Sequence, residues 1–257
     1  MRYVLRFAGV GYLAALLVIP VAVVMKKAFE PGLAEVWASI TTPAAISAFW
    51  LTIMVAAIAV PLNAIFGVLC ALVLERSNLR GRGVLNALLD LPFAVSPVVI
   101  GLALVLVYGR EGWLADLPVQ VLFSLPGIVL ATIFVSVPFV AREVAPVLRE
   151  IGDEAEQAAA TLGANAWQAF RRVTLPAIRW GLATGIVLAT ARALGEFGAV
   201  SVVSGRIQGE TMTLTLLVEQ RFQNFELAGA YAASALLAAI AVAVLLLVNL
   251  LQRRAAQ

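Results

Sequence analysis

Long apolar runs alternate with shorter polar segments along this chain, and six of the runs are long enough to cross a bilayer as helices. A hydrocarbon layer about 30 Å thick needs roughly 20 apolar residues in a helix. The predicted spans cover residues 7–25, 48–74, 84–108, 121–140, 180–203 and 228–251. Prolines interrupt some of them, and Ser96 and Pro97 break the third run. The pattern predicts an all-α polytopic membrane protein with six transmembrane helices.

The first run follows Arg2 and Arg6, as the apolar part of a signal peptide would. However, it is longer than such a region, and no small-x-small cleavage site follows it. We therefore expect a retained helix.

Composition narrows the class further. Hydrophobic residues make up 62% of the chain and charged residues 13%, and the mean hydropathy is +0.99. Histidine is absent, which excludes an imidazole base or ligand, and Cys70 is a single cysteine that cannot form an internal disulfide. The sequence has no Gly-x-x-x-x-Gly-Lys-Ser/Thr loop, metal-ligand cluster or nucleophile–base pair. We therefore expect no catalysis and no cofactor bound by this chain.

The lysines and arginines set the orientation, because loops on the cytoplasmic side are enriched in them. With a cytoplasmic amino terminus, twelve face inward: Arg2, Arg6, Arg76, Arg80, Arg82, Arg142, Arg149, Arg171, Arg172, Arg179, Arg253 and Arg254. Five then face outward: Lys26, Lys27, Arg110, Arg206 and Arg221. Both termini are therefore predicted to be cytoplasmic. The net charge of +3 reflects this topology and not nucleic-acid binding.

The longest polar segment, residues 142–179, lies on the cytoplasmic side in this orientation. It begins with the end of the fourth helix and a loop. One short helix is then predicted near residues 153–162, ended by Gly163, and another near residues 166–173, ended by Leu175 and Pro176. Carboxylates in the first turn of the earlier helix suit the positive end of its dipole. The small side chains of Ala158 and Ala159 would let a partner surface approach closely. We expect this loop to dock a cytoplasmic motor.

At this loop the chain resembles the membrane subunits of bacterial ABC importers. Their loop carries Glu-Ala-Ala, three residues, Gly, nine residues and Ile-x-Leu-Pro. Here Gln157 stands where the family has glutamate, and Val173 replaces isoleucine. Glu154 and Glu156 nearby can supply the missing charge. The resemblance implies an ATPase-coupling set made of Glu154, Glu156, Gln157, Ala158, Ala159, Leu162, Gly163, Leu175 and Pro176.

A second resemblance narrows the branch. Residues 192–205 read Arg-Ala-Leu-Gly-Glu-Phe-Gly-Ala-Val-Ser-Val-Val-Ser-Gly, and residues 209–219 read Gly-Glu-Thr-Met-Thr-Leu-Thr-Leu-Leu-Val-Glu. With residues 90–101, they resemble the permeases of sulfate/thiosulfate importers, and within that group the CysW type. The resemblance covers most of residues 42–247. It implies the type I importer permease fold, which is MetI/ModB-like.

Charged and hydroxyl groups inside the predicted spans are candidates for the translocation path. Arg192 and Glu196 lie four residues apart on one helix and can pair. In one interpretation they neutralise each other, together with Asp90, and fix helix register. In the other, Arg192 attracts a passing dianion. We favour the structural interpretation. Hydroxyls and freed backbone amides near Ser96, Ser201 and Ser204 either line the path or only satisfy broken helices.

A stripe of small residues on the fifth predicted span recurs every four positions, at Gly181, Gly185, Ala189 and Ala193. Such stripes let helices pack backbone to backbone in lipid. The contact can be a sliding one in the pore or ordinary helix packing, and both interpretations stay open.

The resemblance implies the partners. They are a second permease subunit in a heterodimer, CysT-like, two ATPase subunits that hold ATP-Mg, and an external sulfate-binding protein. A homodimer of permeases stays open, because it is possible in the related molybdate branch. We expect a single transmembrane domain over residues 1–257, with a core at about 48–251, in the bacterial cytoplasmic (inner) membrane.

The expected function is the permease subunit of an ATP-driven sulfate/thiosulfate importer that works by alternating access. Molybdate or tungstate is the alternative substrate. A proton- or sodium-coupled carrier would have to use Glu196 and Asp90, and would leave the docking loop without a purpose. A membrane scaffold that transports nothing would tolerate bulky residues at Gly163 and Ala158.

Overall fold

The computed structural model describes residues 2–77, 80–116 and 118–255, which form helices and turns without a strand. The elements are α1 (Arg2–Phe29), α2 (Leu33–Ile40), α3 (Pro43–Arg76), α4 (Arg82–Ala94), α5 (Pro97–Tyr108), α6 (Leu125–Ile151), α7 (Glu154–Thr161), α8 (Ala166–Ala169), the π-helix η1 (Phe170–Thr174), α9 (Leu175–Leu194), α10 (Val200–Val203), α11 (Leu214–Gln223) and α12 (Leu227–Ala255). The all-α expectation is confirmed for these residues.

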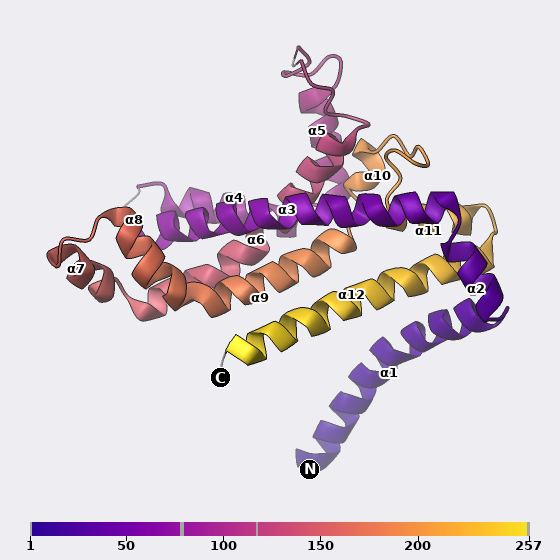
Figure 1. Ribbon diagram of the computed structural model, residues 1–257, viewed down its shortest axis with the longest axis horizontal. Helices are drawn as coiled ribbons and strands as arrows, with labels where there is room; N and C mark the ends of the chain where they lie inside the picture. Colours follow the sequence, from indigo (N-terminus) through magenta and orange to yellow (C-terminus); the bar gives the residue numbers. More distant parts are fainter. Residues whose placement is uncertain (1, 78–79, 117, 256–257) are drawn as a thin grey trace.

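The long helices run along the length of the molecule, with α7 at one end and α2 and α11 at the other (Figure 1). Within the described residues, five helices are long and apolar enough to span a membrane, or up to six if the bent pair α4 and α5 counts as one span. Arg76 and Arg149 lie near the ends of α3 and α6 that meet α7, whereas Arg221 lies on α11 at the opposite end. Met1 and the side chains of Arg2, Arg6, Arg253 and Arg254 lie outside the described part.

The third predicted span, residues 84–108, is not one continuous helix. Its two halves, α4 and α5, meet at an angle of 112°. The residue before a proline is driven out of helical geometry, and Ser96 has an extended ψ of 136° immediately before Pro97. The expected break is confirmed, and α5 projects away from the long axis of the bundle (Figure 1).

The fourth predicted helix continues past its apolar run as expected, because residues 142–151 form the polar end of α6. One other boundary predicted from the apolar runs was wrong. The fifth span does not reach residue 203: α9 ends at Leu194, and Gly195 and Glu196 lead into the separate short helix α10. Hydropathy marks the lipid-facing part of a helix and not where its hydrogen bonds end.

The prediction that Leu175 and Pro176 end the second loop helix was also wrong. Residues 166–194 form one continuous helical stretch, and Pro176 lies in the first turn of α9. A proline ring clashes with the carbonyl four residues earlier in a regular α-helix. The π-helix η1 widens the preceding turn and gives that ring room.

The small-residue stripe of α9 packs closely against α6. A Cβ added at Gly181 would lie 2.7 Å from the carbonyl oxygen of Glu143, and one at Gly185 would lie 2.8 Å from the Cα of Val140. On the other side of α6, a Cβ at Gly67 of α3 would lie 2.6 Å from the Cβ of Val140. Glycine is required at these points because the backbones themselves are in contact.

Candidate functional site

The predicted coupling helix is present as α7, and its ends explain its position. Gly152 ends α6 with a φ of 64°, and Gly163 follows α7 with a φ of 86°. Both conformations favour glycine, which has no Cβ to clash with the backbone. The amide of Ala164 donates to the carbonyl of Ala159 over 3.0 Å, a contact that closes the end of the helix. Gly163 therefore stops the helix as the sequence predicts.

The outer surface of α7, formed by Glu154, Gln157 and Ala158 with the following Leu162, is open to solvent. None of its residues is buried. Glu154, Gln157 and Ala158 are exposed, and Leu162 is 89% exposed. A single exposed leucine does not by itself mark an interface, but the small side chains beside it leave room for a partner surface to approach closely.

The remaining members of the predicted coupling set lie beside this surface or below it. Ala159 and Leu175 are half-buried, and Pro176 is exposed in the first turn of α9. The Gln157 amide donates to the carboxylate of Asp153 over 2.8 Å. A glutamate at this position, as in the importer pattern, would repel Asp153, which gives a physical reason for the glutamine here.

Glu156 points inward to its own chain. Its carboxylate accepts from Nε of Arg76 over 3.0 Å and from the hydroxyl of Thr174 over 2.8 Å. The Glu156 side chain is 23% exposed and that of Arg76 is 18% exposed. The charge of Glu156 is therefore directed to α3 and η1, and not to the outer surface of α7.

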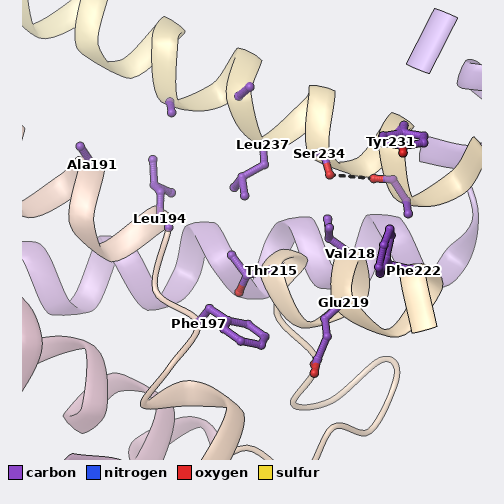
Figure 2. Close-up of a pocket in the computed structure, with 14 residues that line it drawn as sticks. Ala191, Leu194, Phe197, Thr215, Val218, Glu219, Phe222, Tyr231, Ser234 and Leu237 are labelled. Atoms are coloured by element: carbon purple, nitrogen blue, oxygen red, sulfur yellow. Dashed lines mark hydrogen bonds between the residues drawn. The ribbon is translucent and has the colours of Figure 1, made fainter. Parts of the chain in front are cut away.

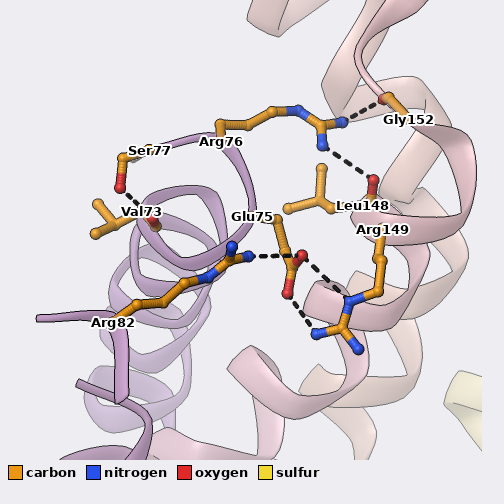
Figure 3. Close-up of polar contacts among 8 residues, drawn as sticks. All are labelled: Val73, Glu75, Arg76, Ser77, Arg82, Leu148, Arg149 and Gly152. Carbon is orange, nitrogen blue, oxygen red and sulfur yellow. Dashed lines mark hydrogen bonds and ion pairs between the residues drawn. The ribbon is translucent and has the colours of Figure 1, made fainter. Parts of the chain in front are cut away.

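Arg76, the last residue of α3, also binds the end of α6 (Figure 3). Its Nη1 donates to the carbonyl of Leu148 over 3.0 Å and its Nη2 to that of Gly152 over 2.6 Å. The last carbonyls of a helix lack partners within the helix. The guanidinium supplies donors to two of them.

Glu75, next to Arg76, joins three helices (Figure 3). Its carboxylate lies 2.7 Å from Arg149 of α6 and 3.0 Å from Arg82 of α4. The Glu75 side chain is 6% exposed, whereas that of Arg149 is 73% exposed. The carboxylate is thus enclosed by two arginines that reach it from the solvent side.

Asp90 does not pair with Arg192 and Glu196, although the sequence left that pairing open. On α4 it forms an ion pair with Arg142 of α6, and both side chains are nearly half-exposed. The partner is an arginine that we assigned only to the cytoplasmic charge balance. Asp90 lies before the break at Ser96, on the helix α4 that packs on α6, and sequence distance alone does not reveal this.

The expected pair of Arg192 and Glu196 is present. Arg192 Nη1 lies 2.5 Å from Glu196 Oε2, and the Glu196 side chain is 2% exposed. This contact lacks hydrogen-bond alignment, so Arg192 acts on that oxygen as a nearby charge. Oε1 of Glu196 accepts from the amide of Ala199 over 2.8 Å, and Thr215 donates to the Glu196 carbonyl over 2.8 Å. These contacts fix the chain where α9 ends.

The three candidate serines differ. Ser96 is exposed at the break between α4 and α5, and its side chain makes no capping hydrogen bond. Ser201 donates to the carbonyl of Gly198 over 2.8 Å, and the buried Ser204 donates to that of Thr211 over 2.6 Å. Two of the three hydroxyls are therefore used to satisfy backbone.

A cavity of about 590 Å³ lies between the end of α9, α11 and α12. Figure 2 shows Leu194, Val218 and Leu237 among the apolar side chains that line it. The charged residue that lines it is Glu219. The carboxylate of Glu219 is neutralised by the guanidinium of Arg206 at 3.1 Å. A cavity of this kind offers nothing that would hold a dianion tightly.

The end of the molecule opposite α7 is held together by Arg221 of α11. Its guanidinium donates to the carbonyls of Ser39 and Gly229, both over 3.2 Å, and to the hydroxyl of Thr42 over 2.9 Å. Burial lowers the pKa of Arg221 below its usual range, but a guanidinium stays charged at neutral pH. This arginine therefore joins α2, the start of α3, α11 and α12.

Sequence reasoning missed the residues that hold the predicted ones in place. Arg76 and Arg142 entered it only as cytoplasmic charges, and Thr174 did not enter it at all. The signal for Arg76 was the adjacent Glu75–Arg76 pair directly at the end of a long apolar run. Nothing in the sequence indicates that Thr174 reaches Glu156, because the π-helix η1 decides where the Thr174 side chain points.

Comparisons with known proteins agree with this geometry. Residues 63–257 match the family described as binding-protein-dependent transport system inner membrane component. The chain is 48% identical over 257 residues to the sulfate transport system permease protein CysW of Synechocystis sp., covering 98% of this chain and 93% of the relative. It is 37% identical over 247 residues to the sulfate transport system permease protein CysT of Escherichia coli, with 95% and 89% covered.

A solved structure shares the fold. The crystal structure of a bacterial ABC transporter involved in the import of the acidic polysaccharide alginate contains a chain that superposes with a TM-score of 0.82. The two chains are 19% identical, and 98% of this chain and 94% of the other are covered. At this identity the likeness establishes the architecture.

Proposed function

The chain belongs to the family of inner membrane components of binding-protein-dependent transport systems, and from this we propose that it is the permease subunit of an ATP-driven sulfate importer. The observation that carries the substrate is the 48% identity to a CysW sulfate permease over nearly the whole chain. The free outer surface of α7 supports the ATP-driven mechanism, because it offers a docking site at the cytoplasmic end.

We propose that the work enters through α7. Closure of two ATPase subunits on ATP would pull α7 and its equivalent in a second permease together. The helices α9 and α4–α5 would then tilt and open the path outward, and hydrolysis would restore the inward-facing form. Coupling residues in this account are the exposed members of the set on α7 and directly after it whose side chains can meet a partner, namely Glu154, Gln157, Ala158 and Leu162.

The partners follow from the same proposal. The chain is similar to both CysW and CysT permeases, which favours a pair of different permease subunits. An external sulfate-binding protein would deliver the oxyanion to the outer end, and ATP-Mg would be held by the ATPase subunits. The site of action is the bacterial cytoplasmic membrane, with residues 142–179 as the coupling loop and residues 48–251 as the core.

The path needs no tight anion site in this account. Arg192 is neutralised by Glu196, and Asp90 is paired with Arg142. Paired charges let a dianion pass without holding it. The two carboxylates that an ion-coupled carrier would have to use are therefore both paired with arginines, which disfavours such a carrier.

The test is uptake of labelled sulfate into vesicles that contain the chain with its second permease and ATPase, supplied with loaded binding protein outside. We expect uptake that requires ATP inside the vesicles and survives collapse of the proton gradient. Uptake without ATP, or its loss when only the gradient is removed, would contradict the proposal. Preferential uptake of molybdate from its own binding protein would reassign the substrate.

A further inference from the structure

The coupling helix has very little holding it to the rest of the chain. None of its residues is buried, so side-chain packing transmits force poorly from α7. The chain enters and leaves it through Gly152 and Gly163, both at positive φ. A helix attached in this way could rotate without moving the membrane helices, unless a specific contact links it to them.

One carboxylate makes that contact. In the part of the chain that the structure describes, Glu156 makes all the side-chain hydrogen bonds from α7 to other helices. The remaining ones stay local, from Gln157 to Asp153 and from Thr161 to the carbonyl of Ala158. Glu156 binds Arg76 at the end of α3 and Thr174 of η1, which continues into α9.

Arg76 extends the connection to a third helix, because it also donates to the carbonyls of Leu148 and Gly152 at the end of α6. Neighbouring Glu75 binds Arg82 at the start of α4. Hydrogen bonds that involve a charged group are stronger than those between neutral groups. The guanidinium of Arg76 makes several of them while it is partly shielded from water. The end of α3 thus contacts α4, α6 and α7, and the bond from Thr174 to Glu156 adds η1 and, through it, α9.

We propose that Arg76 and Glu156, with Thr174, are the positioning residues that carry the movement of α7 into α3, α6 and α9. This inference rests on the proposed function, since it assumes that an ATPase moves α7. It assigns Glu156 to the inner side of the coupling helix, as a link within the permease and not as a contact with the ATPase.

The test uses the whole complex in vesicles and measures sulfate taken up per ATP hydrolysed. The variants are Glu156→Gln, Arg76→Gln, the double variant and Thr174→Val, which keeps the shape of the side chain. Glu30→Gln is the matched control, because it breaks an exposed ion pair with Lys27 at 2.7 Å away from α7. Co-purification of the ATPase and the melting temperature of the complex are measured in parallel.

We expect Glu156→Gln and Arg76→Gln each to assemble with the ATPase and to lower uptake per ATP about fivefold. The double variant should be no worse than the stronger single variant, because both break one link. Thr174→Val should lower uptake per ATP by a smaller factor, and Glu30→Gln should leave uptake per ATP unchanged.

A purely structural role would instead lower the melting temperature, ATP hydrolysis and uptake together, with uptake per ATP unchanged, and that result would overturn the inference. If Glu156→Gln does not assemble, Thr174→Val decides alone, and an unchanged ratio rejects the link. Wild-type vesicles that do not import sulfate with ATP would refute the proposed function itself, which is a distinct outcome.

Discussion

Two arginine–glutamate pairs in this molecule have the same chemistry in different settings. Arg76 and Glu156 connect the end of α3 to α7, and the Glu156 side chain is 23% exposed. Arg192 and Glu196 lie four residues apart at the end of α9, and the Glu196 side chain is 2% exposed. The first pair joins separate helices and can pass on their movement. The second stabilises one helix end and holds a buried charge.

The largest effect is expected when the buried pair is broken. Arg192→Gln leaves the Glu196 carboxylate enclosed without its counter-charge. Breaking a buried pair from one side destabilises proteins by about 3–5 kcal/mol. We expect a large drop in the melting temperature of the detergent-solubilised chain, followed by circular dichroism.

The double variant Arg192→Gln with Glu196→Gln is the control. A glutamine at position 196 can still accept from the amide of Ala199, and no charge remains to be compensated. Much of the lost stability should return. If the single and double variants melt alike, the charge of Glu196 does not depend on Arg192.

A change at Gly163 tests the α7 region without touching its ion pairs. Gly163 has a φ of 86° and no atom within 4 Å of an added Cβ. Gly163→Leu should therefore cost only the left-handed strain, about 1–2 kcal/mol. Because a leucine disfavours the backbone conformation of Gly163, the end of α7 should change its angle. We expect this change to lower uptake per ATP, measured in reconstituted vesicles.

Gly32 provides the matched control, because its φ is 103° and the space around it is also open. Gly32→Leu carries similar strain at the other end of the molecule. Equal losses of uptake per ATP in the two variants would show that strain alone explains the effect.

A smaller effect is expected at Glu75, and it should depend on salt. Glu75→Gln frees Arg149 and Arg82, whose side chains are 73% and 45% exposed and can be hydrated by water. Screening shortens the reach of charges to about 3 Å at 1 M salt. The difference in melting temperature from the wild type should shrink at high salt, whereas that of Arg192→Gln should not. A salt-independent effect at Glu75 would place its carboxylate in a drier environment than the structure has.

The smallest effect is expected at the exposed pair of Lys27 and Glu30, whose side chains are about half-exposed. Exposed pairs contribute little, because water solvates both groups and salt screens them. Lys27→Gln should leave the melting temperature unchanged within error. A clear decrease would indicate that this part of the chain is covered in the protein.

The sequence predicted those features that depend on local spacing. The family was recognised from residues 90–101 and 192–219, and the relatives confirm it. Gly163 marks the end of α7, and the four-residue separation of Arg192 and Glu196 brings them together. Each of these follows from the geometry of a single helix or turn.

Features that depend on contacts between distant residues could not be predicted in this way. Arg76 and Glu156 are 80 residues apart, and Asp90 meets Arg142 only because α4 packs on α6. Pro176 reads as a helix end in the sequence, but η1 accommodates it and the helix continues. Tertiary packing decides these points, and no local pattern reports it.

The most direct test of the account is whether the outer surface of α7 touches a nucleotide-hydrolysing partner. Cys70 is the chain's single cysteine, so Cys70→Ala provides a background in which one new thiol can be placed. Ala158→Cys and Gln208→Cys both replace exposed residues, the first on α7 and the second in the outer segment. We predict that Ala158→Cys cross-links to the ATPase subunit and that this cross-link blocks uptake, while Gln208→Cys is labelled from outside the cell. Labelling of Ala158→Cys from outside, or the absence of any cross-link to an ATPase, would contradict it.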